Sequence, residues 1–214
     1  MSEPAVAPGG NLAPEDEARA NFYALLARLY AAAPDAGLLE AIATAPSLSP
    51  AAGPFETGYA ATGMGPAWEA LREASAGADA DAVAGEFQAL YIGVGRSEIS
   101  LYASHYLGPQ SGRPLAAVRA SLHELGLARR PGSSEFEDHL AILLETMRML
   151  VAGDATRPPA GIAEQRAFFE RHLLPWVLDC CSATRESPIA NYYLRVAQFA
   201  GCFLALERDS LAME

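Results

Sequence analysis

Residues able to do chemistry gather at two places in the chain. Ser104 follows a glycine-broken segment, and Glu135, Glu137, Asp138 and His139 stand together before an apolar run. Ser104, His139 and Asp138 have the residue types of a nucleophile with its base, but neighbours on a helix point about 100° apart and cannot simply relay a proton. Carboxylates at a helix start are stabilised by the macrodipole. We therefore expect helix capping here in preference to hydrolase chemistry.

The histidines and glycines favour neither a metal centre nor a nucleotide site. No two of the four histidines lie three or four residues apart, so a pair of ligands on one helical turn is absent. Gly93 and Gly95 begin a GxG pattern, but the third glycine of a dinucleotide-binding loop is missing and no strand precedes it. The sequence therefore predicts no bound metal and no cofactor.

Charge and cysteine usage narrow the class of partner and the compartment. The 15 Lys and Arg residues face 26 Asp and Glu residues, and the formal net charge of -11 repels nucleic acid and attracts a basic peptide. A role of this acidity in solubility alone is the alternative that composition leaves open. Cys180, Cys181 and Cys202 form no CxxC pair, so we expect reduced thiols in the cytoplasm.

Length and apolar content predict one domain with a core of its own. The chain has 214 residues, of which 51% are hydrophobic. Residues 1–13 lack a basic start and an apolar run, so we expect a flexible tail that is neither a secretory leader nor a membrane anchor, followed by one domain over 14–214. Charges, glycine or proline interrupt every apolar run before it reaches the ~20 residues of a membrane span, so no membrane insertion is expected.

Apolar residues recur at helical spacing along most of the chain, which predicts the elements that must position these side chains. The expected helices cover residues 14–32, 35–45, 66–71, 79–91, 114–126, 136–151, 162–183 and 188–208, with a break at Pro175. Glycine breaks the segment 93–109, so we expect an ordered loop with one helical turn. No segment alternates like a half-buried strand, and the predicted fold class is all-α.

Three separated stretches together resemble the TorD, DmsD and NarJ group of redox-enzyme maturation chaperones. EFQALYIGVGRSEISLYASHYL, which begins at Glu86, resembles the signature of the group. EFEDHLAILLETM, which begins at Glu135, resembles its acidic helix-start motif, and FFERHLLPWV, which begins at Phe168, resembles a later motif. The first and last predicted helices are also similar, so the resemblance covers most of the chain. Each motif alone is of moderate specificity, and their order and spacing carry the resemblance.

The resemblance implies a TorD-like helical bundle that is a monomer or a domain-swapped dimer. It implies a cytoplasmic chaperone, not an enzyme, that holds the twin-arginine signal peptide and the apo form of a molybdenum oxidoreductase catalytic subunit. Such a leader has a basic stretch before an apolar one, so its receptor needs carboxylates beside an apolar groove. The signal-peptide-binding residues carried over from the motif positions are Phe87, Leu90, Tyr91, Leu101, Tyr102, Ser104, Glu135, Glu137, Asp138 and His139.

Two places depart from the family pattern, and two alternative functions stay open. Ser100 and Leu101 replace a proline pair before Tyr102, and Phe136 replaces a proline before Asp138, which leaves loop rigidity and the choice of client open. One alternative is a helical adaptor or assembly subunit that binds no signal peptide. The other is an enzyme that handles a nucleotide or a cofactor.

Overall fold

Helices make up the regular structure of the chain, as the sequence pattern predicts. The computed structural model describes residues 12–48, 63–93, 97–108, 113–127 and 135–213, which contain no strand and one isolated antiparallel bridge, between Tyr102 and His139. The elements are α1 (Pro14–Ala31), α2 (Ala36–Thr44), α4 (Met64–Ala76), α5 (Ala80–Phe87), η1 (Gln88–Ile92), α6 (Ala103–Leu107), α7 (Pro114–Glu124), α8 (Leu140–Ala152), α9 (Ile162–His172), α10 (Val177–Glu186) and α11 (Tyr192–Met213). None of these helices combines the length and apolarity needed to cross a membrane.

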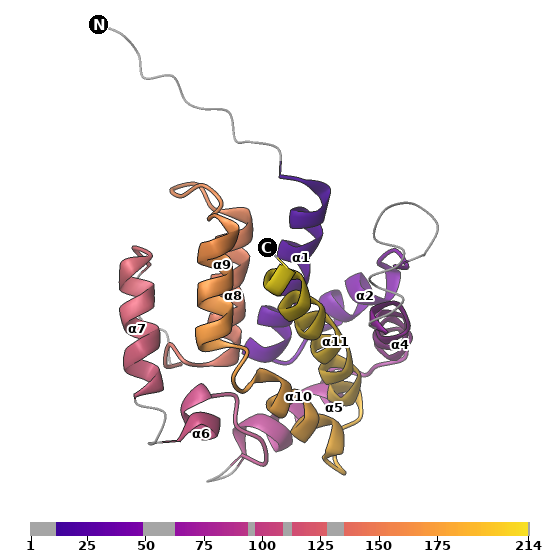
Figure 1. Ribbon diagram of the computed structural model, residues 1–214. Helices are drawn as coiled ribbons and strands as arrows, with labels where there is room; N and C mark the ends of the chain where they lie inside the picture. The colour runs from indigo at the N-terminus through magenta and orange to yellow at the C-terminus, as the bar shows by residue number, and fades with distance from the viewer. Residues whose placement is uncertain (1–11, 49–62, 94–96, 109–112, 128–134, 214) are drawn as a thin grey trace, which may run out of the picture.

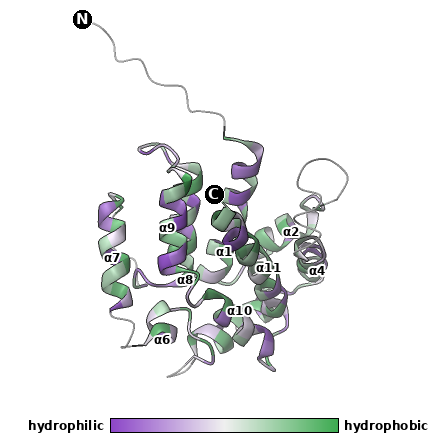
Figure 2. Ribbon diagram, viewed as in Figure 1, coloured by the Kyte–Doolittle hydropathy of each residue, from purple (hydrophilic) through white to green (hydrophobic). Residues whose placement is uncertain are grey.

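The core lies between the long central helices. In Figure 1, α1, α8, α9 and α11 occupy the middle of the molecule, with α7 at one edge and α2 and α4 at the other. α1 packs mainly on α8, and α11 packs on α10 and α4. Fully buried side chains of α1 and α8 fill this contact, among them Tyr23, Leu26, Leu29, Leu144 and Met147. Hydrophilic residues make up much of α9 (Figure 2); Glu164 and Glu170 there are exposed while Phe168 and Phe169 are buried, which is the amphipathic pattern that drives helices together.

Two predicted helix starts differ from the observed ones because distant segments contact them. The helix expected from residue 136 begins at Leu140, because His139 has an extended backbone (φ -71°, ψ 137°) and pairs with Tyr102. The helix expected from residue 188 begins at Tyr192, where the Glu86 carboxylate accepts backbone N–H bonds from residues 191, 192 and 193 at 2.8, 3.0 and 2.8 Å. The predicted break around Pro175 is confirmed between α9 and α10.

The segment that leads to the predicted loop changes its helix type. The helix expected over 79–91 consists of α5 and the π-helical turn η1, a rare form that occurs mostly as single turns. Gly93 ends it at φ +65°, a left-handed conformation that costs glycine no steric strain. The one helical turn expected within 93–109 is α6, whereas residues 94–96 and 109 of this loop, and residues 1–11 of the expected tail, lie outside the described residues.

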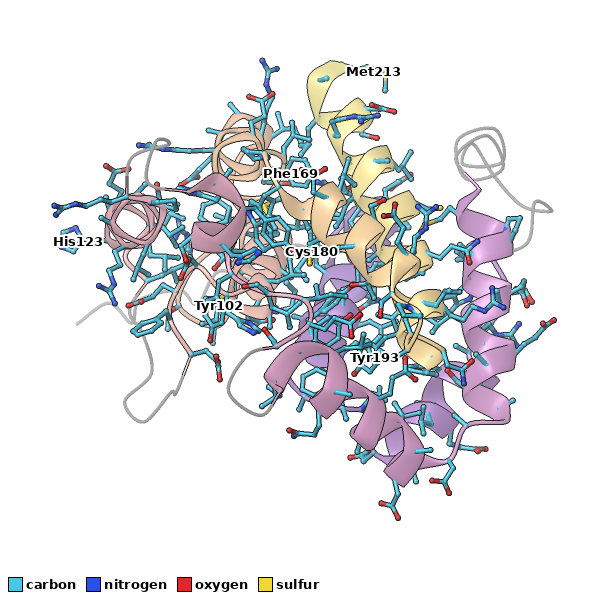
Figure 3. The ribbon with its side chains drawn as sticks, turned by 90° about the horizontal axis from the view of Figure 1, so that it is seen from below. Tyr102, His123, Phe169, Cys180, Tyr193 and Met213 are labelled. Atoms are coloured by element: carbon cyan, nitrogen blue, oxygen red, sulfur yellow. The ribbon has the colours of Figure 1, made fainter. Side chains whose placement is uncertain are left out.

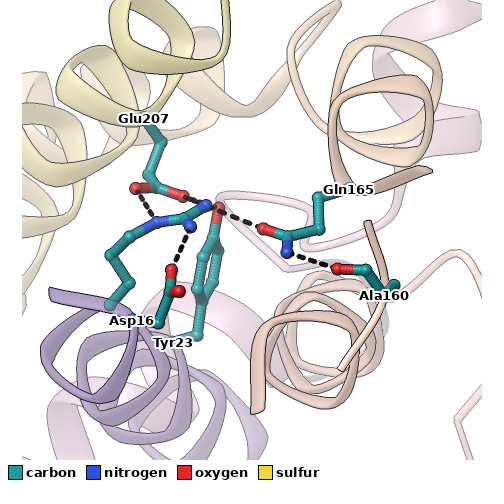
Figure 4. A network of polar contacts seen from close by, with 6 residues as sticks. Asp16, Tyr23, Ala160, Gln165 and Glu207 are labelled. Atoms are coloured by element: carbon teal, nitrogen blue, oxygen red, sulfur yellow. Dashed lines mark hydrogen bonds and ion pairs between the residues drawn. The ribbon is translucent and has the colours of Figure 1, made fainter. Parts of the chain in front are cut away.

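A buried polar network ties the last helix to the first (Figure 4). The Glu207 carboxylate on α11 is 2% exposed and accepts hydrogen bonds from Arg19 Nε at 2.8 Å, Arg19 Nη2 at 2.9 Å and the Tyr23 hydroxyl at 2.9 Å. Arg19 also donates to the Gln165 side-chain oxygen at 3.0 Å, and the Gln165 amide donates to the carbonyl of Ala160 at 3.0 Å. Every buried charge here has an opposite charge or a hydrogen bond, which is the condition for keeping it buried.

Candidate functional site

Two segments that are more than 30 residues apart in sequence lie side by side. The Leu140 backbone N–H donates to the Leu101 carbonyl at 2.8 Å, and the Ala103 N–H donates to the Asp138 carbonyl at 3.1 Å. Tyr102 and His139 form the antiparallel bridge between these bonds. The structure therefore places the end of the first motif beside the acidic motif.

Asp138 is buried where these two segments meet, and it stabilises this junction by a hydrogen bond. It is 1% exposed, and its Oδ2 accepts a hydrogen bond from the Ser104 backbone N–H at 3.0 Å in the first turn of α6. A carboxylate bonded to backbone N–H at a helix start is a favourable arrangement. In this conformation Asp138 positions Ser104, whose side chain is exposed, and is itself shielded from a ligand in solvent.

His139 caps the following helix. Its Nδ1 accepts a hydrogen bond from the Ala141 backbone N–H at 3.2 Å, so the neutral ring carries its proton on Nε2. Burial lowers the pKa of His139, against the charges of Glu135 and Asp138, which raise it. The ring lies edge-to-face on Tyr102, with 4.9 Å between centroids. The capping role expected for this motif is confirmed for His139.

Tyr102 is the residue of the bridge that reaches the surface. Its ring is partly exposed, and its hydroxyl donates to the Glu135 carboxylate. Burial, followed by that hydrogen bond and the Glu135 charge, raises the pKa of Tyr102 well above its usual range. Phe136 is 52% exposed, and its ring centroid lies 6.5 Å from that of Tyr102. Figure 3 shows Tyr102 on the same side of the molecule as His123 of α7, away from Met213.

We call Tyr102, Ser104, Glu135, Phe136 and Glu137 the Tyr102 surface. It combines two aromatic rings, two hydroxyls and two carboxylates on residues that are exposed or partly exposed. Glu137 already binds a guanidinium, because Arg119 of α7 places Nε and Nη2 each 3.0 Å from its Oε2. Carboxylates beside aromatic rings suit the binding of arginine, which pairs with the acid and stacks on the ring.

The predicted apolar part of the site lies in the core. Phe87, Leu90, Tyr91 and Leu101 are 5%, 0%, 6% and 3% exposed. The Tyr91 ring contacts Tyr193 with 5.2 Å between centroids, and its hydroxyl lies 3.2 Å from the Thr184 hydroxyl. In this conformation these four side chains are part of the core, and Leu101 alone among them pairs directly with the acidic segment, through the Leu140 N–H.

The third motif contacts the first through the rings of Trp176 and Tyr106. Tyr106 of α6 stacks on Trp176 at 5.2 Å and 27°, and its hydroxyl donates to the Ser100 carbonyl at 3.0 Å. The Ser100 hydroxyl accepts from the Tyr102 backbone N–H at 3.3 Å. Ser100, at the place of a family proline, thus fixes the start of the bridge through hydrogen bonds.

One hollow in the described structure lies away from the Tyr102 surface. It has a volume of about 670 Å³ between α4, α5 and the start of α11, with Glu73, Asp79 and Arg195 on its walls. Glu86, which caps α11, is the motif residue that lines it. Among the described residues no group of three or more His, Cys, Asp or Glu side chains could hold a metal ion.

Comparison with known proteins identifies the family. No curated protein matched the chain. The family described as "Nitrate reductase delta subunit" matches residues 58–182, more than half of the chain, and this range contains the Tyr102 surface and all three sequence motifs. The chain therefore belongs to the nitrate reductase delta subunit family, the NarJ- and TorD-type chaperones that assist the maturation of molybdoenzymes.

Proposed function

We propose that this protein holds the twin-arginine signal peptide and the apo form of a molybdenum oxidoreductase catalytic subunit in the cytoplasm until the cofactor is in place, and that the leader binds at the Tyr102 surface. The observation that carries the proposal is the arrangement of Glu135 and Glu137 beside the rings of Tyr102 and Phe136, with an arginine already paired to Glu137. Family membership supports the class of client.

The chemistry of a twin-arginine leader matches this surface. Its guanidinium groups pair with carboxylates in charge-assisted hydrogen bonds and stack on aromatic faces. The apolar stretch that follows can cover the exposed Phe136 ring. The net charge of -11 speeds the encounter with a basic segment without itself fixing the affinity.

The predicted binding residues divide into two roles in this proposal. Tyr102, Ser104, Glu135 and Glu137 contact the leader directly. The buried residues do not contact the leader: Leu101, Asp138 and His139 hold the exposed residues in place through the bridge and its hydrogen bonds, and Phe87, Leu90 and Tyr91 belong to the core. Ordering a flexible leader costs about 2 to 5 kcal/mol, so an exposed surface of this kind gives a reversible hold.

Titration calorimetry with a leader peptide tests the proposal. Glu137→Gln removes one charge-assisted bond and should weaken binding by about 1 to 2 kcal/mol, roughly 5- to 30-fold, after allowance for solvent screening. Glu145→Gln is the matched control, because this carboxylate pairs with Arg148 on α8 and is half-exposed. Equal affinities for the two variants would remove Glu137 from the site. Capture of the apoenzyme with no affinity for its leader would instead favour an assembly subunit.

A further inference from the structure

The ion pair between Arg119 and Glu137 is asymmetric in its exposure. The Glu137 side chain is 12% exposed, whereas the Arg119 side chain is 49% exposed. Both guanidinium contacts, from Nε and Nη2, reach the same oxygen, Oε2, at 3.0 Å. A shielded carboxylate is therefore covered by an arginine that arrives from the solvent side, on the helix at the edge of the molecule (Figure 1).

Helix α7 does not depend on Arg119 for its position. Val118 and Leu122 are 1% and 7% exposed and pack into the core. Ser121 lies 2.9 Å from His172 Nε2, and burial, with a smaller contribution from the Arg171 charge, lowers the pKa of His172 to about 4, so the ring stays neutral near pH 7. The Arg119 side chain can therefore swing away from Glu137 while the rest of α7 stays in place.

We propose that Arg119 is an internal stand-in for a leader arginine. It occupies Glu137 while no client is bound, leaves when a client guanidinium arrives, and returns when the client departs. This inference rests on the proposed function, since it names Glu137 as the carboxylate that receives the leader. It assigns to Arg119 a role in setting affinity: every leader arginine that pairs with Glu137 must first displace the Arg119 guanidinium, which α7 keeps close to that carboxylate.

The inference predicts that a positively charged residue opposes the binding of a positively charged ligand by a specific contact. In Arg119→Gln the competitor is gone, and leader affinity should rise by about 1.5- to 5-fold, the range expected for a partly exposed pair. A double-mutant cycle isolates the contact, because Arg119→Gln should give no such gain when Glu137 is already Gln. Arg113→Gln, just before α7 and also exposed, is the control for the loss of one positive charge.

The test is titration calorimetry of the wild type, Arg119→Gln, Glu137→Gln, the double variant and the control with a leader peptide. Circular dichroism first checks that each variant keeps the helicity of the wild type. The inference is supported by a gain in Arg119→Gln that exceeds the gain in Arg113→Gln and disappears in the double variant. It is overturned by unchanged or weaker binding in Arg119→Gln, by an equal gain in Arg113→Gln, or by a gain that persists without Glu137. Failure of the proposed function is a different result: the wild-type protein itself would not bind the leader.

Discussion

Asp138 should stabilise the fold of the site without contacting the ligand. Its carboxylate is 1% exposed and accepts a hydrogen bond from the Ser104 N–H at 3.0 Å. Asp138→Ala removes this bond and leaves the N–H in the first turn of α6 without its acceptor. A hydrogen bond to a charged group contributes about 1.5 to 3 kcal/mol. Because Ser104 lies at the surface, where water can replace part of the bond, we expect a loss of roughly 1 to 2 kcal/mol in the free energy of unfolding.

Urea unfolding followed by circular dichroism measures this loss. A small domain of this kind should keep its slope and shift its midpoint to lower urea. Asp81→Ala is the control, because Asp81 is an exposed carboxylate in the first turn of α5 and should give a smaller shift. If both variants unfold at the same midpoint, the buried bond from Ser104 to Asp138 does not hold the junction, and the reasoning on the buried residues of the site is wrong.

Three further predictions follow from buried or exposed groups. His172 has a pKa of about 4 in the fold, so the unfolded chain binds more protons than the folded one below about pH 6.5. The free energy of unfolding should therefore fall by about 2 kcal/mol between pH 7 and pH 5. His172→Gln should reduce this fall, as measured by the urea midpoints at the two pH values. Glu207→Leu removes the buried carboxylate that accepts hydrogen bonds from Arg19 and Tyr23, and it should lower the free energy of unfolding by about 3 kcal/mol. An unchanged urea midpoint would contradict this. Phe136→Ser should leave the midpoint almost unchanged but weaken leader binding by ~1 kcal/mol if the peptide covers ~40 Å² of the ring; equal calorimetric affinity would remove this contact.

Helix periodicity predicted the fold class and most elements, because amphipathic spacing is a local property. It failed where a distant segment decides the local conformation. Residues 136–139 continue the helical pattern in sequence, yet they turn and extend because residues 101–103 pair with them. Backbone pairing with a segment more than 30 residues away has no signal in a single periodic pattern.

The apolar residues of the candidate site show a second limit. Phe87, Leu90 and Tyr91 have the spacing of a helix face, and a face that binds a peptide has the same spacing as one that packs in the core. The neighbours that bury them come from far along the chain, such as Tyr193 and Thr184. Sequence could therefore place these residues in the region but could not assign their exposure.

The pairing of Arg119 with Glu137 was not predicted from the sequence, again because it depends on how distant segments pack. Arg119 lies 18 residues before Glu137, on a helix whose own pattern shows only an amphipathic face. The resemblance to the chaperone family pointed to the acidic residues, but none of its three motifs lies in α7. Only the position of α7 beside the acidic segment reveals the ion pair between them.

A photo-crosslink from the Tyr102 surface tests the central claim most directly. The photoreactive residue benzoylphenylalanine is placed at Phe136, and separately at Ile162, an exposed apolar residue on α9, and each full-length protein is irradiated with the apo client that carries its leader. The account predicts crosslinks from position 136 to the leader next to its arginine pair, and their loss when those arginines are replaced by glutamine. Crosslinks to the leader from position 162 but not from 136 would contradict it.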